Sequence, residues 1–412
     1  MDSTGRRTAP IATPTPLDAR SPAPDVARGA LLLLIAVANA PLHLWGTAPG
    51  AFGAHPVEGG VADRVVQTLA LVLVDGRTYP VFAFLFGYGI VQLHRRQHTA
   101  GVPHDEARRL LRRRHGWMVA FGAVHALLLW SGDVIGAYGL IGLVLTAAFL
   151  DRRDRTIAVW VGILTGLLLL STALVGAWAS ATAPTGPATV DGDLTALPEP
   201  AAMEDHLLAA AVRFGYWLLQ LLLDWLLLVM PLAVLVAFLA ARHQVLERPA
   251  DHLRLLRWTA VTGIAVGWGA GSVTALQNLG VLRADGSVGL GLLLLQNCAG
   301  LACGLGYAAL FGLLAVRWGA RRGPVVRALQ ATGRRSMTCY LAQSVVFAPL
   351  MSAWGLGWGQ HLSSWSIALV AVATWAATVA LAVALERAGR RGPAETLLRR
   401  LTYPRPAVAD AR

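Results

Sequence analysis

Charged side chains are scarce in this sequence of 412 residues: 14% of its residues are charged, whereas 55% are hydrophobic. A soluble domain has about 25% charged residues, so the composition argues against one. Apolar runs such as residues 27–45 and 225–241 are long enough to cross a hydrocarbon core, which takes roughly 20 helical residues. These runs lack the alternation of polar and apolar residues that marks a barrel strand. The sequence therefore predicts an all-α, polytopic membrane protein.

Lysine is absent and cysteine is rare. All 35 basic residues are arginine, which we attribute to GC-rich coding rather than to chemistry. Cys298, Cys303 and Cys339 lie in apolar runs, are odd in number and match no spacing of metal ligands. We interpret them as small core residues and expect neither a disulfide nor a bound metal. Residues 1–25 contain no apolar segment of a signal peptide, so we expect the first hydrophobic run to remain as a spanning helix.

The hydrophobic runs fit about ten transmembrane helices. We place them at 28–47, 61–94, 115–131, 134–150, 156–180, 206–241, 258–280, 288–316, 335–353 and 363–386. With a cytoplasmic amino terminus, the arginine clusters fall on the inner side, as the positive-inside rule requires. We thus predict both termini in the cytoplasm, one transmembrane domain over residues 26–403, and two cytoplasmic tails at 1–25 and 404–412. The amino-terminal tail is expected to be disordered.

Two of these spans are too long for a simple crossing. We expect the span 61–94 to break in "DGRTYP", because Gly76 and Pro80 are both boundary signals. We expect the span 206–241 to kink at Pro231, since proline removes a helical hydrogen bond.

An ionisable side chain inside a membrane span is costly, and is therefore a candidate for function. His125 lies roughly 7–8 Å below the outer end of its helix, and Asp133 follows the next turn. Along a continuous helix the two are too far apart for contact, so they meet only through a bend at Gly132 or through a bound substrate. Their structural alternatives are a core histidine bonded to a main-chain carbonyl and a cap of the span that begins at Val134. As catalytic residues, they would form a base in a wet cavity.

Asp75, Arg77 and Tyr79 stand at the start of a half-helix within the membrane. The free N–H groups and the positive dipole end of such a half-helix favour an anionic group. Together with Arg77 they form a candidate binding site for a carboxylate or a phosphate. The structural alternative is an internal Asp75–Arg77 pair that holds a loop.

The first span carries polar groups at three depths. Arg28 lies at its inner end, Asn39 lies roughly 16 Å deeper, and His43 is one turn further out. The structural alternatives are a snorkelling arginine and an interhelical hydrogen bond from the asparagine. Other polar groups within spans are candidates to line a cavity: Arg213, Asp224, Gln277, Asn278, Gln296, Asn297, Tyr340 and Gln343. We interpret His55 as only a loop residue.

Five stretches resemble, in order, the recurrent stretches of the YeiB-like bacterial membrane proteins, a family of unknown function. They read "RGALLLLIAVANA", "FAFLFGYGIVQLHRR", "RRLLRRRHGWMVAFGAVHALLLWSGDVIGAYGL", "GRRSMTCYLAQS" and "GPAETLLRRLTY". The most specific is the His-x-x-Leu-Leu-Trp-x-Gly-Asp block from His125 to Asp133. The last block departs from the family's Gly-Pro-Leu-Glu-Trp at Ala394 and Thr396 but keeps Glu395, so the docking of the final helix is expected to differ.

The same family is more distantly similar to the ten-span membrane acyltransferases, including the heparan-glucosaminide acetyltransferase type. Members of known chemistry move an acyl group from a cytoplasmic thioester to an acceptor that is often on the far side of the membrane. The resemblance implies that Arg28 matches a recurrent arginine and that Asn39 occupies the position of a catalytic histidine. Asparagine is no base near neutral pH, so a later histidine, His43, His55 or His125, would have to act. We prefer His125.

Three functional hypotheses follow from these residues. The first is acyl transfer from an acyl-coenzyme A donor to a hydroxyl or amine acceptor, with Arg28 on the phosphates, Asn39 on the thioester carbonyl and His125 as base. The alternative is a transporter or exporter of a small anionic molecule that uses Arg77 and Arg213. The third is a non-catalytic membrane partner. In each case we expect a protein of the bacterial inner membrane that contacts the lipid bilayer and has no permanently bound cofactor. We expect no binding to nucleic acid, because the arginines that give the net charge of +12 lie where the positive-inside rule places them.

Overall fold

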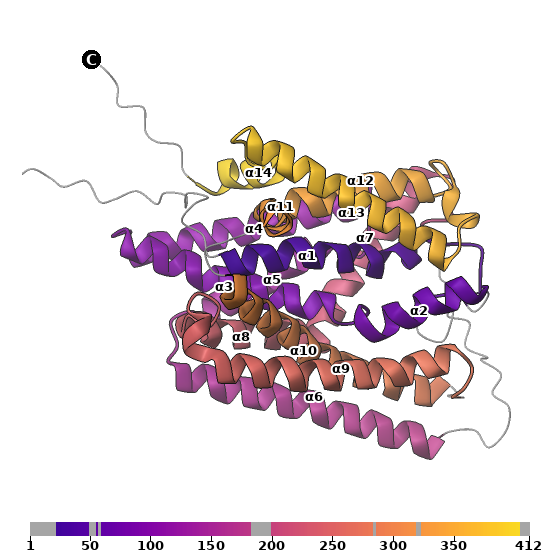
Figure 1. The fold of residues 1–412 in the computed structure, drawn as a ribbon, viewed down its shortest axis with the longest axis horizontal. Helices are drawn as coiled ribbons and strands as arrows, with labels where there is room; N and C mark the ends of the chain where they lie inside the picture. The colour runs from indigo at the N-terminus through magenta and orange to yellow at the C-terminus, as the bar shows by residue number, and fades with distance from the viewer. Residues whose placement is uncertain are drawn as a thin grey trace, which may run out of the picture.

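A computed structural model describes residues 22–48, 55–56, 59–182, 199–282, 286–318 and 323–403, and within these ranges it contains helices and no strand. The all-α prediction is therefore confirmed for the described residues. The main helices (Figure 1) are α1 Pro22–Asn39, α2 Val61–Leu73, α3 Thr78–Thr99, α4 His104–Leu128, α5 Val134–Phe149, α6 Asp154–Thr182, α7 His206–Leu226, α8 Val229–Arg242, α9 Leu253–Asn278, α10 Gly286–Trp318, α11 Pro324–Arg334, α12 Ser336–Met351, α13 Ser364–Arg387 and α14 Pro393–Thr402.

Seven helical segments of the described chain are long and apolar enough to cross a membrane. Three further apolar helices, α5, α8 and α12, are shorter. The chain is thus a helical protein of the multi-pass membrane type. A total of ten spans and a cytoplasmic location of both termini remain predictions.

The peripheral helices present apolar side chains outward. On α6, Leu167, Leu170 and Leu174 are about half exposed, and on α9 Trp258 and Val261 are more exposed still. Such a continuous apolar surface is unfavourable in water and suits contact with lipid tails. Figure 1 shows α6 and α9 along one edge of the bundle and α12 and α13 along the other, with α1, α3 and α5 between them.

The long helices run side by side, and α1 begins at the same end of the molecule at which α14 lies (left in Figure 1). We call this end the arginine-rich end, since five helices that finish there carry arginine in the last turn: α3, α8, α10, α13 and α14. A cation at a helix carboxyl end interacts favourably with the helix dipole. The arrangement gives the bundle one strongly basic end.

Both expected interruptions of long spans are present, one of them at a different residue. α2 ends at Leu73 and α3 begins at Thr78, so the break in "DGRTYP" is confirmed. The kink predicted at Pro231 is wrong in position, because α7 ends at Leu226 and Leu228 adopts a left-handed conformation with φ of 59°. Pro231 lies in the first turn of α8, where its missing N–H has no helical acceptor to lose.

Two short amphipathic helices, α11 and α14, were not expected from hydropathy. The Glu395 side chain of α14 accepts hydrogen bonds from the main-chain N–H groups of Met337 and Thr338 at 2.9 and 3.1 Å, which caps α12. The retained glutamate of the last motif therefore docks the final helix. At the other terminus, α1 begins at Pro22, within the expected tail; residues 1–21 and 404–412 of the two tails lie outside the described residues.

Candidate functional site

The turn between α4 and α5 brings two distant ionisable side chains together. α4 ends where Arg213 of α7 donates to the main-chain carbonyls of Leu127 and Leu128 at 3.0 and 3.4 Å. α5 begins at Asp133, whose Oδ2 accepts from the N–H of Gly136 at 2.7 Å. An aspartate is a preferred residue at this capping position, so the interpretation of Asp133 as a helix cap is confirmed.

The chain reversal at this turn places His125 against Asp133. Nδ1 of His125 lies 2.8 Å from Oδ1 of Asp133, and their side chains are 2% and 0% exposed. The two residues therefore contact each other directly, because the chain bends between them. The alternative interpretation, in which His125 is bonded to a main-chain carbonyl of a neighbouring helix, is wrong. If the carboxylate is ionised it only accepts hydrogen bonds, and this contact then requires the proton on Nδ1. Nε2 is buried and has no hydrogen-bond partner among the described residues.

Two glycines allow this close packing of α4, α5 and α7. A Cβ on Gly122 would lie 2.4 Å from Oδ2 of Asp133 and 2.4 Å from the main-chain nitrogen of Gly136. A Cβ on Gly136 would lie 2.6 Å from the ring of Trp217. All three distances are far below contact distance, so the position of the carboxylate depends on these residues having no side chain.

A cavity of about 240 Å³ enters the bundle near the arginine-rich end. Arg28, Arg96, Arg114 and Arg334 line its outer part, together with two carboxylates, Asp25 and Glu395. Arg334 is paired with Glu386 at 2.7 Å. Arg28 pairs with Asp25 at 3.2 Å and donates to the main-chain oxygen of Leu85 at 2.7 Å. Four arginines and two carboxylates give this part of the cavity a net positive charge, which favours an anionic ligand.

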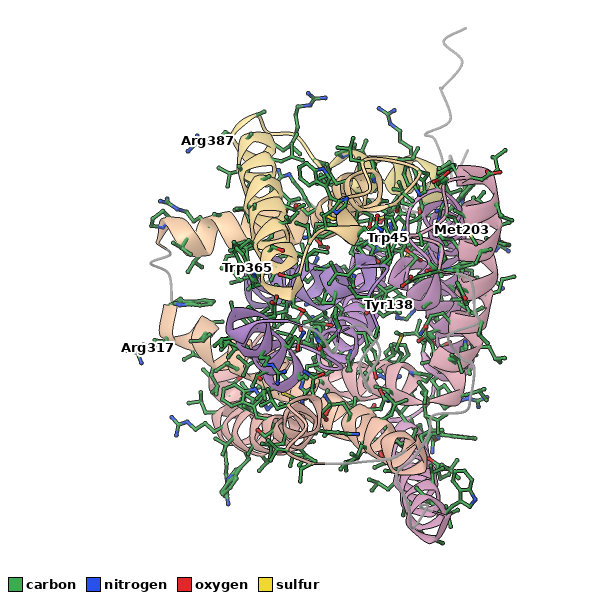
Figure 2. The ribbon with its side chains drawn as sticks, turned by 90° about the vertical axis from the view of Figure 1, so that its right-hand side faces the viewer. Trp45, Tyr138, Met203, Arg317, Trp365 and Arg387 are labelled. Atoms are coloured by element: carbon green, nitrogen blue, oxygen red, sulfur yellow. The ribbon has the colours of Figure 1, made fainter. Side chains whose placement is uncertain are left out.

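The deeper walls of this cavity are apolar and end at two tyrosines. Leu32, Ile35, Phe82, Phe86, Met118 and Ile135 form its sides, and Tyr138 and Tyr340 lie at its inner part. Figure 2, in which the view is along the helices, shows Tyr138 in the middle of the molecule and Arg387 at its periphery. His115 also lines this cavity and is buried, and neither of its ring nitrogens has a hydrogen-bond partner in the described part of the chain.

A second, much smaller cavity of about 10 Å³ lies further along α1. Asn39, His43, Trp130, Gln343 and Tyr340 are among its lining residues. The ring of His43 stacks on Trp130, with centroids 4.3 Å apart. Arg28 lines the larger cavity and Asn39, at the end of α1, lines the smaller one together with His43 of the 3-10 turn Ala40–His43.

Tyr340 lines both cavities and also contacts the histidine of the α4–α5 turn. Its ring centroid is 5.4 Å from that of His125, and its hydroxyl lies 3.5 Å from the main-chain oxygen of Gly132. His125 and Asp133 are not among the residues that line either cavity. The dyad, which is our name for His125 and Asp133, therefore lies one side chain away from both cavities.

The other polar group predicted from the sequence lies in a different part of the bundle. Arg77 is fully buried, and its two terminal nitrogens donate to the main-chain oxygens of Asp75 and, at 2.6 Å, of Gly267. Tyr79 donates to Oδ1 of Asn297 at 2.7 Å. Among the described residues that line the two cavities, none of Asp75, Arg77 and Tyr79 occurs. An anion at Arg77 would have to displace these carbonyls.

His55 differs from its interpretation as a simple loop residue. It is buried, and its Nε2 lies 2.7 Å from Oδ2 of Asp75. The α2–α3 break brings the two together, and no local pattern in the sequence signals this long-range contact. His115 was also missed, because it directly follows arginines 112–114 that we assigned to topology.

The chain is similar to bacterial proteins of unknown function. Residues 240–405 match a family described as "Protein of unknown function (DUF418)". The uncharacterized protein YeiB of Escherichia coli is 27% identical over 398 residues, which cover 92% of this chain and 95% of that protein. The chain is thus similar to YeiB over nearly its whole length. YxaH of Bacillus subtilis is 24% identical over 358 residues, 83% of each chain, and is also described as uncharacterized.

The similarity to YeiB is not confined to one part of the chain. The alignment with YeiB covers nearly the whole of both chains, whereas a 39.9 kDa protein of Bacillus acidopullulyticus matches over 157 residues, 38% of this chain, at 30% identity. The YeiB-like family has no assigned activity. A function must therefore be argued from the dyad and the two cavities.

Proposed function

We propose that this YeiB-like protein is a membrane acyltransferase that moves an acyl group from an acyl-coenzyme A donor to a hydroxyl or amine acceptor. One observation carries the proposal: a buried imidazole is oriented by a carboxylate, its Nε2 has no partner among the described residues, and it lies beside the tyrosine that lines both a basic cavity and a second polar one. An oriented imidazole is the commonest general base of enzymes.

The larger cavity suits a donor with an anionic head and an apolar arm. Arg28, Arg96, Arg114 and Arg334 would bind phosphate groups, since arginine forms two parallel hydrogen bonds with them. The apolar walls between Leu32 and Ile135 would hold the thioester arm. We place this end in the cytoplasm of a bacterial inner membrane, with both termini, because that is where the arginines are expected and where a coenzyme A donor is available.

The smaller cavity supplies polar groups for the acceptor and the carbonyl. Asn39 and Gln343 carry amide groups at its wall, and Gln343 donates to the main-chain oxygen of Leu32 at 3.3 Å. An amide N–H that faces a thioester carbonyl stabilises the negative charge that develops on its oxygen. Rotation of Tyr340 would join the two cavities and expose Nε2 of His125.

The reaction then follows from the dyad. Nε2 of His125 takes the proton of the acceptor O–H or N–H as that atom attacks the thioester carbonyl carbon. The C–S bond breaks, and the leaving thiolate takes the proton from the imidazolium, which gives the acylated acceptor and free coenzyme A. Asp133 keeps Nδ1 protonated throughout and stabilises the transient imidazolium.

Transport of an anion by Arg77 and Arg213 receives less support from the geometry. Both guanidinium groups donate to main-chain carbonyls, those of Gly267 and Leu127. Their observed role is to satisfy buried backbone, which leaves acyl transfer as the function that the site favours.

The test is release of free thiol by the purified protein in lipid nanodiscs, with acyl-coenzyme A of several chain lengths and a panel of hydroxyl and amine acceptors. His125→Ala is expected to lower turnover by about 10²–10⁴-fold, the usual contribution of a general base. His252→Ala and His361→Ala, at exposed or partly exposed histidines away from the dyad, serve as controls and should retain turnover. Failure of the folded wild type to bind or cleave any acyl-coenzyme A, or equal turnover in His125→Ala, would contradict the proposal.

A further inference from the structure

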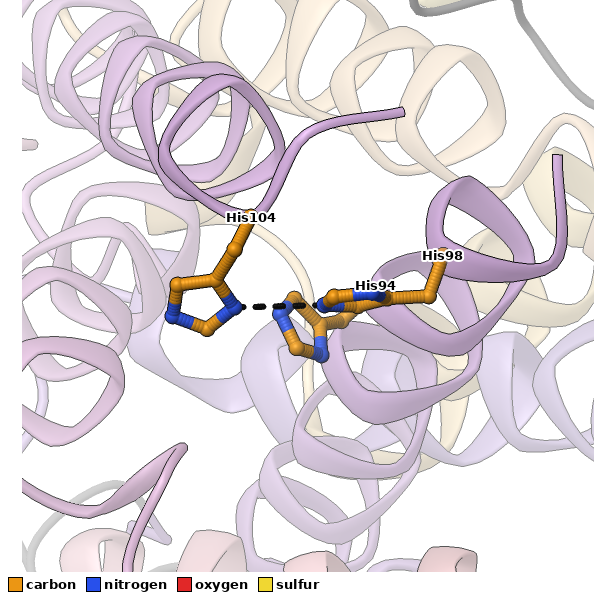
Figure 3. Close-up of side chains that lie close together, drawn as sticks. All are labelled: His94, His98 and His104. Carbon is orange, nitrogen blue, oxygen red and sulfur yellow. Dashed lines mark hydrogen bonds between the residues drawn. The ribbon is translucent and has the colours of Figure 1, made fainter. Parts of the chain in front are cut away.

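Three histidines meet at the arginine-rich end, outside the cavities. His94 and His98 are four residues apart on α3, and so lie on one face of that helix. His104 is the first residue of α4, and the short α3–α4 connection turns through Gly101, which has φ of 78°. Figure 3 shows the rings of His98 and His104 directed at each other, with His94 beside them.

The spacing of the ring nitrogens matches a metal site. One ligand nitrogen from each ring lies within 4.8 Å of the other two, and Nε2 of His98 is 3.2 Å from Nδ1 of His104. Two imidazole nitrogens bound to tetrahedral zinc at about 2.0–2.1 Å are about 3.3 Å apart. A hydrogen bond would explain the 3.2 Å pair alone. It does not explain why the third ring, that of His94, lies beside them, because Nε2 of His94 is buried and has no partner among the described residues.

The ring of His104 also contacts a carboxylate. Nε2 of His104 lies 3.3 Å from Oδ2 of Asp151, a residue that also pairs with Arg108. A metal-bound imidazole commonly donates its other N–H to a carboxylate, which fixes the ring and its tautomer. The nearby guanidinium groups of Arg95 and Arg108 are each paired with a carboxylate, Glu247 and Asp151, which reduces their repulsion of a cation.

We propose that His94, His98 and His104 bind a divalent zinc-type metal ion, with Asp151 as the carboxylate that orients His104. Nδ1 of His104 and Nε2 of the other two rings are the ligands, and water completes the tetrahedron. The ion would join the end of α3 to the start of α4. Arg96 lines the larger cavity and lies between His94 and His98 in the sequence. The ion would therefore also fix the position of that part of the cavity wall. The prediction of no bound metal rests on the spacing of the cysteines and does not take these three histidines into account.

The test uses the full chain without a polyhistidine tag, stripped with a chelator and titrated with zinc chloride against a competing dye and with cobalt chloride. We expect one zinc per chain and the visible absorption of tetrahedral cobalt. His98→Ala and His104→Ala alter exposed side chains and should abolish stoichiometric binding without loss of fold. Asp151→Asn should weaken binding about 10–100-fold, as for other carboxylates behind a metal ligand.

Matched controls separate this site from adventitious binding by histidine. His252→Ala alters a histidine at the same end of the bundle, and His361→Ala alters one after α12; both should retain one zinc per chain. Absence of stoichiometric zinc binding in the wild type would overturn the proposal. So would zinc binding retained in the double variant His98→Ala/His104→Ala, confirmed as folded by its elution as a single species. Neither outcome depends on acyl transfer.

Discussion

The dyad and the Arg77 region are both buried, both ionisable and both placed at a helix break, yet they differ in how their polar atoms are satisfied. At Arg77 the two terminal nitrogens donate to main-chain oxygens at the α2–α3 junction and on α9. At the dyad, Nδ1 of His125 has its carboxylate but Nε2 has no partner in the described chain. In the Arg77 region, Nε of Arg77 and Nδ1 of His55, which pairs with Asp75, also have no partner in the described chain. These residues line neither cavity, whereas the dyad lies beside the tyrosine that lines both.

The comparison shows that a buried charge in an apolar bundle is an incomplete indicator of function. Intramembrane ionisable groups are functional candidates because they are costly, but main-chain carbonyls released at a broken helix also need donors. Arg77 donates to such a carbonyl at Asp75, and Arg213 donates to those of Leu127 and Leu128. The useful question for each buried group is which of its atoms remain unsatisfied, and beside which cavity.

The largest expected effect is on the chemistry of the dyad. Asp133→Asn keeps a good helix cap, because asparagine caps as well as aspartate, but removes the negative charge beside Nδ1 of His125. We expect acyl-transfer turnover to fall about 10²–10⁴-fold with little change in melting temperature. Asp205→Asn is the matched control, since Asp205 caps α7 through the N–H of Leu207 at 2.8 Å; its turnover should be unchanged. Equal turnover in both variants would make the dyad structural only.

A smaller effect, on stability, is expected at Arg77. Arg77→Met keeps most of the apolar stem but removes the hydrogen bonds of the guanidinium to the carbonyls of Asp75 and Gly267, and a hydrogen bond from a charged group contributes about 1.5–3 kcal/mol. We expect a lower melting temperature and a lower yield of folded protein. Arg64→Met, at an exposed arginine of α2, should leave both unchanged. A stable Arg77→Met variant that has lost uptake of an anion in vesicles would restore the transport hypothesis.

Hydropathy and arginine placement predicted the helices well because lipid imposes strong rules on both. The sequence-based spans 134–150, 335–353 and 363–386 agree with α5, α12 and α13 within two residues at each end. The short amphipathic helices α11 and α14 were not predicted, because helices at the end of the bundle are neither long nor apolar enough to be recognised by hydropathy. The break near Pro231 was misplaced because proline is tolerated in a first helical turn, so it indicates a region rather than a residue.

The site was less predictable because it depends on contacts between distant segments. The eight-residue separation of His125 and Asp133 correctly required a bend, but the sequence could not show whether that bend was present. Nor could it show that Tyr340 of α12 packs 5.4 Å from the histidine ring. Arg28, Asn39 and Gln343 line the cavities, whereas Asp75, Arg77 and Tyr79 lie in another part of the bundle, and local sequence did not distinguish the two groups.

The smallest expected effect tests how tightly the dyad region is packed. Gly122→Ala places a methyl group 2.4 Å from Oδ2 of Asp133, so α4 and α5 must separate. Such overpacking costs about 1–3 kcal/mol, and turnover should fall with the displaced carboxylate. Gly116→Ala is the control on the same helix, because a Cβ there would meet nothing within 4 Å; it should be neutral or slightly stabilising, since alanine favours helix by about 1 kcal/mol over glycine. If Gly122→Ala were as stable and as active as Gly116→Ala, the contact between α4 and the carboxylate would be looser than the structure shows, and the dyad would need no such close packing to work.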